Sequence, residues 1–167
     1  MRSSLALSLV SIATLFNLAV PGQTRRHGSS RTSYSAKAAA EVTAGRAQIA
    51  SQIKLLTHFL YIFGGVTKDI QTAIASADGG SATVVQQNER SKARVLQSIA
   101  DVRKGLQQLE TSFGSSPVLK TYYPNLAGVG DIGVAAEKSA QAARYDQCGK
   151  SLLQAVDKLT DALAAMK

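Results

Sequence analysis

The spacing of apolar residues after Val42 is the feature that most constrains the fold. From residue 49 they recur every three or four positions, with Thr67 at the one weak position: Ile49, Ile53, Leu56, Leu60, Phe63, Ile70 and Ile74. Such a repeat places its members on one stripe of a helix. The register continues through Gly64 and Gly65 without a slip, so the sequence predicts one long helix over about residues 36–78, which a kink at the two glycines would leave nearly collinear.

A second long helix is predicted after a turn over residues 78–81. Thr83 and Gln86 match a T-x-x-Q capping box, in which each side chain satisfies a free donor at a helix N-terminus. The apolar residues that follow keep the four-three spacing: Val95, Ile99, Val102, Leu106, Leu109 and Phe113. Residues 114–117, Gly-Ser-Ser-Pro, are expected to end this helix.

The last third of the chain predicts two shorter helices. Residues 117–131 are too apolar for a free linker and are expected to pack over one end of the bundle as a short helical turn. Asp131 is expected to cap the next, Ala-rich helix, and a break is expected near Cys148 and Gly149, with Ser151 and Gln154 as a further capping box. The fold class is therefore all-α: an antiparallel up-down bundle of about four helices, two long and two shorter, forming a single domain over residues 36–167.

The first 40 residues have the pattern of a leader. Arg2 precedes a largely apolar, uncharged stretch, and small or modest residues stand before a cut at Gln23, as in a secretory signal peptide. We expect residues 1–22 to be removed and residues 23–35 to form a basic, Ser- and Arg-rich disordered tail. This predicts a secreted or periplasmic protein. A membrane anchor over residues 5–21 and mitochondrial import are the alternatives, the latter because residues 1–40 contain no acid.

The net charge of +8 belongs mainly to this leader. Residues 1–40 hold five basic residues and no acids, whereas the remainder holds 14 basic and 11 acidic residues. A nucleic-acid binder carries its basic surface on the folded domain. The best candidate surface runs from Arg90 to Lys104, but Glu89 and Asp101 interrupt it. Nucleic acid is therefore not an expected partner.

Several motifs resemble catalytic or phosphate-binding sequences without their required context. Residues 128–133 match G-x-G-x-x-G, but the strand that the dinucleotide fold needs is not predicted. Gly149-Lys150-Ser151 lacks the first glycine of a phosphate-binding loop, and Ser51-x-x-Lys54 lacks the companion elements of penicillin-recognising enzymes. His58 falls opposite the apolar stripe, the folded part holds no second His, and an axial Met for haem would have to come from Met166, one residue from the chain end. We expect no enzyme, cofactor or metal site.

Three residues remain as candidate contacts for a ligand or partner: Tyr122, Tyr123 and Cys148. The two tyrosines could stand at the mouth of a site between helices, or cap the core with their hydroxyls in water. Cys148, the only thiol, is expected to be buried. The sequence favours an exported, non-catalytic interaction or structural module that binds a protein partner or itself. The alternative is a carrier for an apolar small molecule held between helices.

Overall fold

The computed structural model describes residues 29–75 and 82–167. The expected signal peptide, its cleavage site and the turn over residues 78–81 lie outside this range. The described elements are α1 (Ser29–Ala75), α2 (Ala82–Ser115), the 3₁₀ turn η1 (Leu119–Thr121), α3 (Tyr123–Leu126), α4 (Val129–Gln141) and α5 (Tyr145–Ala165).

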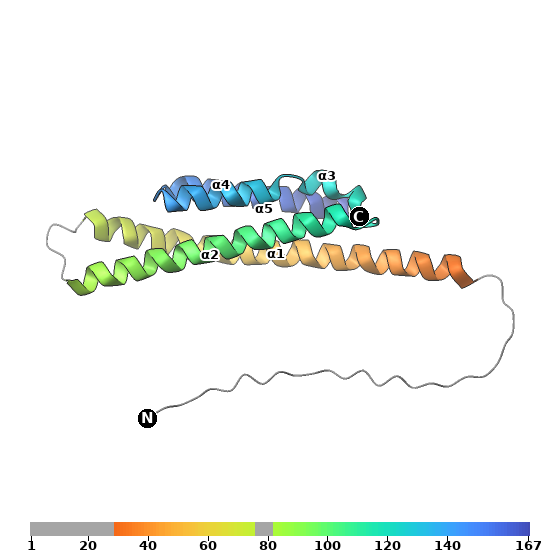
Figure 1. The fold of residues 1–167 in the computed structure, drawn as a ribbon, viewed down its shortest axis with the longest axis horizontal. Helices are drawn as coiled ribbons and strands as arrows, with labels where there is room; N and C mark the ends of the chain where they lie inside the picture. The colour runs from red at the N-terminus through yellow and green to blue at the C-terminus, as the bar shows by residue number, and fades with distance from the viewer. Residues whose placement is uncertain (1–28, 76–81) are drawn as a thin grey trace, which may run out of the picture.

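Four helices form the predicted antiparallel up-down bundle (Figure 1). The long helices α1 and α2 make one layer, and the shorter α4 and α5 lie over them as a second. Each layer is tied to the other, because α1 packs on α5 and α2 packs on α4. The all-α fold class, with two long and two shorter helices, is therefore confirmed.

The long first helix is continuous, as the unbroken apolar register predicts. Its central stripe is buried, including Phe63 and the weak position Thr67, whose hydroxyl donates a 2.8 Å hydrogen bond to the Phe63 carbonyl. Gly64 and Gly65 lie in the middle of α1, and a Cβ on either one would meet no other atom within 4 Å. Neither glycine is needed for close packing in this bundle. They therefore mark neither a break nor a helix contact.

The first residues of α1 and α2 differ from the predicted ones. Residues 29–35, which the sequence assigns to a disordered tail over residues 23–35, are helical because α1 begins at Ser29, and residues 23–28 lie outside the described range. Residues 29–35 contain no Gly or Pro to oppose a helix. The capping box at Thr83 and Gln86 is wrong, since Thr83 already lies inside α2, which begins at Ala82. Helix starts predicted from a short motif shift by one or two residues in this way.

The segment after α2 packs over one end of the bundle, as predicted. It forms η1 and α3, and Leu119 and Leu126 insert into the core. The Ser116 hydroxyl accepts the amides of Val118 and Leu119, at 3.2 and 3.0 Å, and donates to a carboxylate oxygen of Glu41 in α1. The corner is thereby fastened to both long helices.

Two boundary predictions in the last third are wrong. Gly128, and not Asp131, caps α4, and Asp131 lies in its first turn, where a carboxylate favours the helix dipole. The break expected near Cys148 lies instead between Gln141 and Tyr145. Cys148 and Gly149 are inside α5, and Ser151 caps nothing because it lies one and a half turns into the helix.

The α4–α5 turn explains the misplaced break. Ala143 adopts a left-handed conformation, with φ of 54°. Its amide donates to the Ala140 carbonyl at 2.9 Å, and the Arg144 amide donates to the Ser139 carbonyl at 2.8 Å. This pair of bonds is a Schellman motif, which normally places glycine where Ala143 stands. The sequence therefore lacks the usual signal for this helix end.

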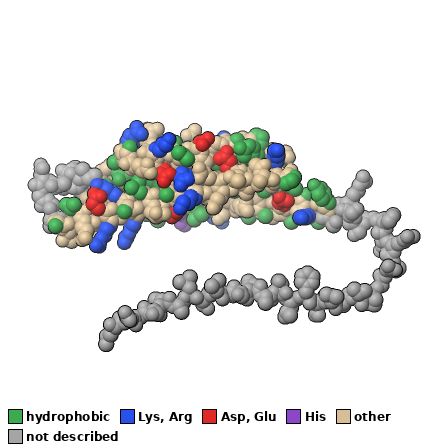
Figure 2. Space-filling model, in the orientation of Figure 1, with side chains coloured by type: hydrophobic (Ala, Val, Ile, Leu, Met, Phe, Trp, Pro, Cys, Tyr) green, Lys and Arg blue, Asp and Glu red, His purple; other side chains and the backbone are tan. Residues whose placement is uncertain are grey.

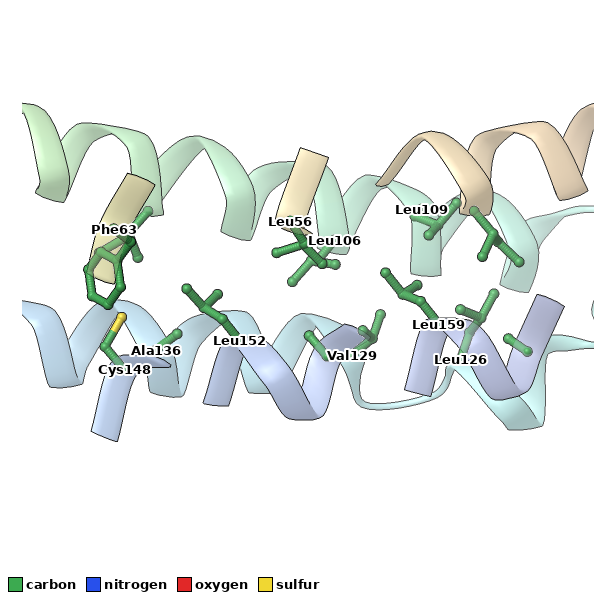
Figure 3. Packing of buried hydrophobic residues seen from close by; sticks show 14 of the residues in the cluster. Leu56, Phe63, Leu106, Leu109, Leu126, Val129, Ala136, Cys148, Leu152 and Leu159 are labelled. Carbon is green, nitrogen blue, oxygen red and sulfur yellow. The ribbon is translucent and has the colours of Figure 1, made fainter. Parts of the chain in front are cut away.

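The core between the layers combines large side chains from α1, α2 and α5 with mainly small ones from α4 (Figure 3). Leu56, Phe63, Leu106 and Leu109 lie on the side of the long helices. The buried residues of α4 are mainly small, whereas those of α5 are small and large in equal number: Gly130, Gly133, Ala136, Ser139 and Ala140 in α4, and Tyr145, Cys148, Leu152, Ala155, Leu159 and Ala162 in α5. Small side chains allow α4 and α5 to approach α1 and α2 closely.

Candidate functional site

Tyr122 and Tyr123 lie at the end of the bundle closed by α3. Both are half-buried and pack against the hydrophobic core. The Tyr123 ring covers Gly114 of α2, where a Cβ would lie 3.2 Å from a ring carbon. Tyr123 also lines a shallow surface pocket with Glu110 and Asp131. The arrangement is that of tyrosines capping a core while their outer edges remain in water.

Cys148 lies near the other end of the bundle and is fully buried in α5 (Figure 3). It sits beside Phe63 of α1, whose ring also makes an edge contact with Tyr145 at 6.2 Å between centroids. Burial raises the pKa of the Cys148 thiol to about 11. A thiol that is both inaccessible and protonated at neutral pH is a poor nucleophile. The three candidate residues therefore do not form one site.

The G-x-G-x-x-G segment holds an anion supplied by the chain itself. The amides of Gly128 and Gly130 donate to the two carboxylate oxygens of Glu110 in α2, at 2.6 and 2.8 Å. Gly128 has φ of 85°, a conformation that favours glycine and that turns its amide toward this carboxylate. Glu110 thus occupies the N-terminus of α4, where a phosphate would bind in a nucleotide-binding protein.

The other two glycines of the motif serve close packing between α2 and α4. A Cβ on Gly130 would lie 2.8 Å from a Glu110 carboxylate oxygen, and one on Gly133 would lie 3.2 Å from the Arg103 Cα. All three glycines are thereby explained by helix capping and helix contact. The segment carries the spacing of a dinucleotide motif but not its chemistry.

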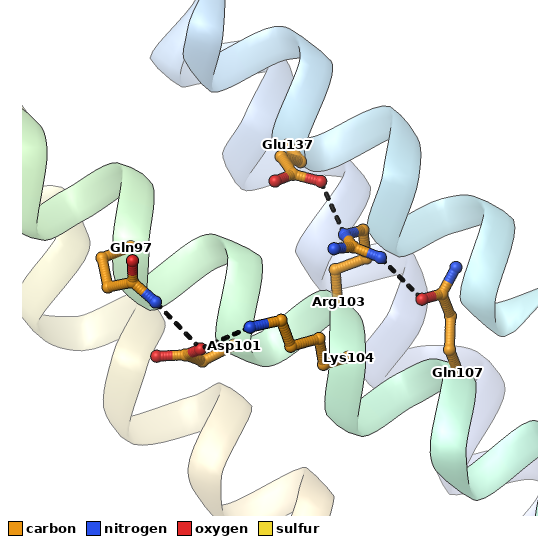
Figure 4. Close-up of polar contacts among 6 residues, drawn as sticks. All are labelled: Gln97, Asp101, Arg103, Lys104, Gln107 and Glu137. Atoms are coloured by element: carbon orange, nitrogen blue, oxygen red, sulfur yellow. Dashed lines mark hydrogen bonds and ion pairs between the residues drawn. The ribbon is translucent and has the colours of Figure 1, made fainter.

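The basic residues of α2 are largely paired with acids (Figure 4). Arg103 Nε lies 2.6 Å from a carboxylate oxygen of Glu137 in α4, and both side chains are about one-quarter exposed. Lys104 lies 3.6 Å from Asp101, whose carboxylate also accepts from Gln97. Further along α2, Glu89 holds Lys92 at 2.7 Å, and this hydrogen bond raises the pKa of Lys92.

Acids and bases are also interspersed over the face of the molecule in the space-filling view (Figure 2). The expected interruption of the basic surface by Glu89 and Asp101 is thus visible as two ion pairs. His58, as predicted, is exposed on α1. Within residues 29–75 and 82–167, no group of three or more His, Cys, Asp or Glu side chains could hold a metal ion.

A groove between α1 and α5 lies next to the α4–α5 turn. Its apolar wall comes from Leu60, Phe63, Tyr145 and Leu153, and Leu153 is 54% exposed. Two lysines and one acid stand among its polar lining residues: Lys68, Lys150 and Asp146. This groove is at the far end from Tyr122 and Tyr123, so the mouth predicted from the tyrosines is not the mouth of this groove.

Sequence reasoning missed a second apolar line on α1. Leu55, Phe59, Ile62 and Val66 repeat with the same four-three spacing beside the buried stripe, and we call these four residues the outer stripe. Leu55 is 58% exposed and Ile62 is 61% exposed, whereas Phe59 and Val66 are half-buried. The signal was present in the sequence, because residues 55–67 contain no charged side chain apart from His58.

The stretch Tyr34–Thr72 of α1 is also long and apolar enough to meet the length and composition test for a membrane span. A mostly buried core helix can meet the same test, but only 17% of the most apolar window in this stretch is buried, although α1 packs on α2 and α5. Comparison of the chain with known protein families, with curated proteins and with solved structures finds no match.

Proposed function

We propose that this protein is an exported, non-catalytic helical bundle that works by binding another protein or a second copy of itself. The observation that carries this proposal is the outer stripe of α1. Leu55 and Ile62 are more than half exposed and aligned at helical spacing, next to two half-buried members of the same line. Large apolar side chains that share one exposed line mark a surface used in protein contact.

The groups that could support catalysis favour the same proposal. Cys148 is buried with a raised thiol pKa, and His58 is exposed on a different helix. The amides that could bind a phosphate already hold the Glu110 carboxylate. Each of these groups has a structural role or stands apart from the others. Export is supported by the leader pattern in residues 1–22.

The test is a native mass spectrum of the protein purified from its own host. We expect a chain that starts at Gln23 and carries a protein partner, or is a multiple of its own mass. A full-length chain would contradict removal of the leader. A monomer with nothing bound, at every concentration and in the presence of host extracellular proteins, would contradict the interaction module.

The groove between α1 and α5 supports a second candidate, a carrier for an apolar small molecule with a negatively charged end. Leu60, Phe63 and Leu153 offer an apolar wall, and Lys68 and Lys150 lie within the same groove. In this case the native spectrum shows an added mass of a small molecule that is lost on denaturation. Leu153→Asp places a negative charge, of the same sign as that of the proposed ligand, in the apolar wall. This variant is then expected to lose the added mass, whereas Leu55→Asp on the outer stripe retains it.

A further inference from the structure

We infer that the partner of the outer stripe is a second copy of this chain, bound antiparallel across a two-fold axis near Leu60 and Tyr61. This rests on the proposed function, because it names the partner of the same surface. In the dimer, Arg94 of each copy lies level with Asp101 of the other. Three features of the described helices lead to this arrangement: the symmetry of the stripe, the register of α2 and the placement of opposite charges.

The outer stripe is symmetric about its own centre. Its steps are four, three and four residues, so reversing the helix direction leaves the spacing unchanged. In an antiparallel pair centred between Leu60 and Tyr61, Leu55 meets Val66 of the second copy and Phe59 meets Ile62. A two-fold interface requires this kind of self-complementary patch, in which the same residues serve both sides.

The register of α2 places a second helix beside the same centre. Gly45 of α1 packs against Phe113, and Gln52 packs against Gly105. Moving one residue forward along α1 therefore corresponds to moving about one residue back along α2. Extending this antiparallel register by two turns brings the centre of the outer stripe level with Gln97 and Ser98.

One line of α2 faces the outer side of the α1–α2 pair. Gly105, Gln108 and Ser112 line a groove there together with Gln48, Ser51 and Gln52 of α1. That line continues toward the start of α2 at the same three-four spacing, through Asp101, Ser98 and Arg94. Gln52 belongs to the α1 line of Phe59 and Val66, seven and fourteen residues on, so the outer stripe and this line of α2 border one surface.

The charges on this surface complement each other only in the antiparallel arrangement. Arg94 and Asp101 lie at equal distances on either side of the centre at Gln97 and Ser98. Both are exposed, and Arg94 makes no ion pair within the part of the chain that the structure describes. A two-fold axis brings Arg94 level with Asp101 of the second copy twice. Parallel pairing would instead put each Arg94 level with the Arg94 of the second copy, so that this pairing of opposite charges would not form.

The size of the surface predicts a reversible dimer. The stripe and its flanking polar positions, Gln48 to Asp69, extend roughly 33 Å along α1 at 1.5 Å per residue. Together with the bordering line of α2, a seam of this length reaches the low end of specific interfaces, about 1,200 Å² in total. The dimer is therefore expected to dissociate on dilution.

The first test is sedimentation equilibrium of the protein purified from its own host, over a dilution series. We expect a monomer–dimer equilibrium that Ile62→Glu weakens at least tenfold. Lys54→Glu is the matched control, because Lys54 is an exposed residue of α1 that lies outside the outer stripe, and it is expected to dimerise as the unaltered protein does. Circular dichroism confirms that each variant retains its helices.

The charge pair gives a sharper test that does not alter the apolar core. Arg94→Asp and Asp101→Arg each place like charges level with one another, and each is expected to weaken dimerisation several-fold. The double variant restores opposite charges and is expected to recover dimerisation. Equal dimerisation of all four proteins, or no recovery in the double variant, would overturn the inference.

Orientation is tested by cross-linking with a short bifunctional maleimide. Ser98→Cys lies close to the two-fold axis and is expected to cross-link, whereas two copies of Ser112→Cys lie about 43 Å apart along the seam and are not. The native Cys148 is buried and does not compete. Preferential cross-linking of Ser112→Cys would indicate a different arrangement and contradict the antiparallel dimer.

The outcomes separate this inference from the proposed function. A protein that stays monomeric alone but is purified in complex with a different host protein contradicts self-association and leaves the interaction module standing. A monomer that co-sediments with anionic lipid vesicles, and loses this through Ile62→Glu, makes the stripe a membrane surface and overturns the dimer. A monomer without protein or lipid binding overturns both proposals.

Discussion

The Glu110 carboxylate accepts the backbone amides of Gly128 and Gly130, at 2.6 and 2.8 Å, and so caps α4 from a neighbouring helix. These are charge-assisted hydrogen bonds at a helix N-terminus, where they also meet the positive end of the helix dipole. Removing the carboxylate leaves these amides without an acceptor. We expect Glu110→Ala to lower the free energy of unfolding by about 1–2 kcal/mol in urea denaturation.

Glu89→Ala is the control for this variant. Glu89 is an exposed acid of the same helix and pairs with Lys92. Its loss is expected to change stability by less than about 0.5 kcal/mol. Equal effects of the two substitutions would contradict the capping role. Because Glu110 fills the amide site, saturating ATP is expected to leave the melting temperature of the unaltered protein unchanged.

Two glycines of this chain are expected to respond in opposite directions to the same substitution. Gly133→Ala would put a Cβ 3.2 Å from the Arg103 Cα, where the backbone of α2 resists displacement, and we expect a net loss of about 1 kcal/mol. Gly64→Ala adds a methyl group in open space within a helix, and we expect a gain of about 0.5–1 kcal/mol. Thermal and urea denaturation of both variants measures this. The same sign for both would contradict the packing described for α4 against α2.

The left-handed residue of the α4–α5 turn offers a stabilising substitution. Ala143 has φ of 54°, where a Cβ is strained and glycine is not. We expect Ala143→Gly to raise the free energy of unfolding by up to about 1 kcal/mol, since relief of strain exceeds the added entropy of the unfolded chain. Ala142 next to it has φ of −84°, so Ala142→Gly is expected to destabilise. A loss of stability in Ala143→Gly would mean that the turn is built differently.

The buried thiol predicts a pH dependence. Burial raises the pKa of Cys148 from 9.0 to about 11, so the folded state holds this proton more tightly than the unfolded state does. The contribution to stability is complete below pH 9 and is lost as the pH rises toward about 11. We expect the free energy of unfolding to fall more steeply across this window in the unaltered protein than in Cys148→Ala. The native thiol should also react with a disulfide reagent at pH 8 far more slowly than after unfolding, and fast reaction of the folded protein would contradict its burial.

The long helices could be predicted because large apolar residues define them. Ile49, Leu56 and Phe63 recur at heptad spacing and are all buried, so one pattern predicts both the helix and its inner face. Of the two shorter helices, α4 buries Gly133, Ala136 and Ser139, which carry little hydrophobic signal. The boundary between α4 and α5 depends instead on Ala143, and an alanine in the sequence does not predict a left-handed turn as a glycine does. The position of the break could therefore not be found from the sequence.

The candidate site shows the same division. The burial of Cys148 and the exposure of His58 could be predicted from their positions relative to the apolar stripe. The occupant of the G-x-G-x-x-G amides could not, because Glu110 lies 18 residues earlier in the chain and reaches Gly128 only when α2 and α4 pack together. The outer stripe could have been found, since its spacing repeats that of the inner one.

The first turns of α1 extend past the rest of the bundle (Figure 1). Tyr34 is 71% exposed, and among the side chains described from residue 34 onward the first hydrogen bond that α1 makes to the rest of the chain joins Glu41 to Ser116. The twelve residues from Ser29 to Ala40 therefore form a helical spacer of about 18 Å. A pull on Ser29, at the start of α1, is therefore carried along the helix for about 18 Å before it reaches the Glu41–Ser116 bond.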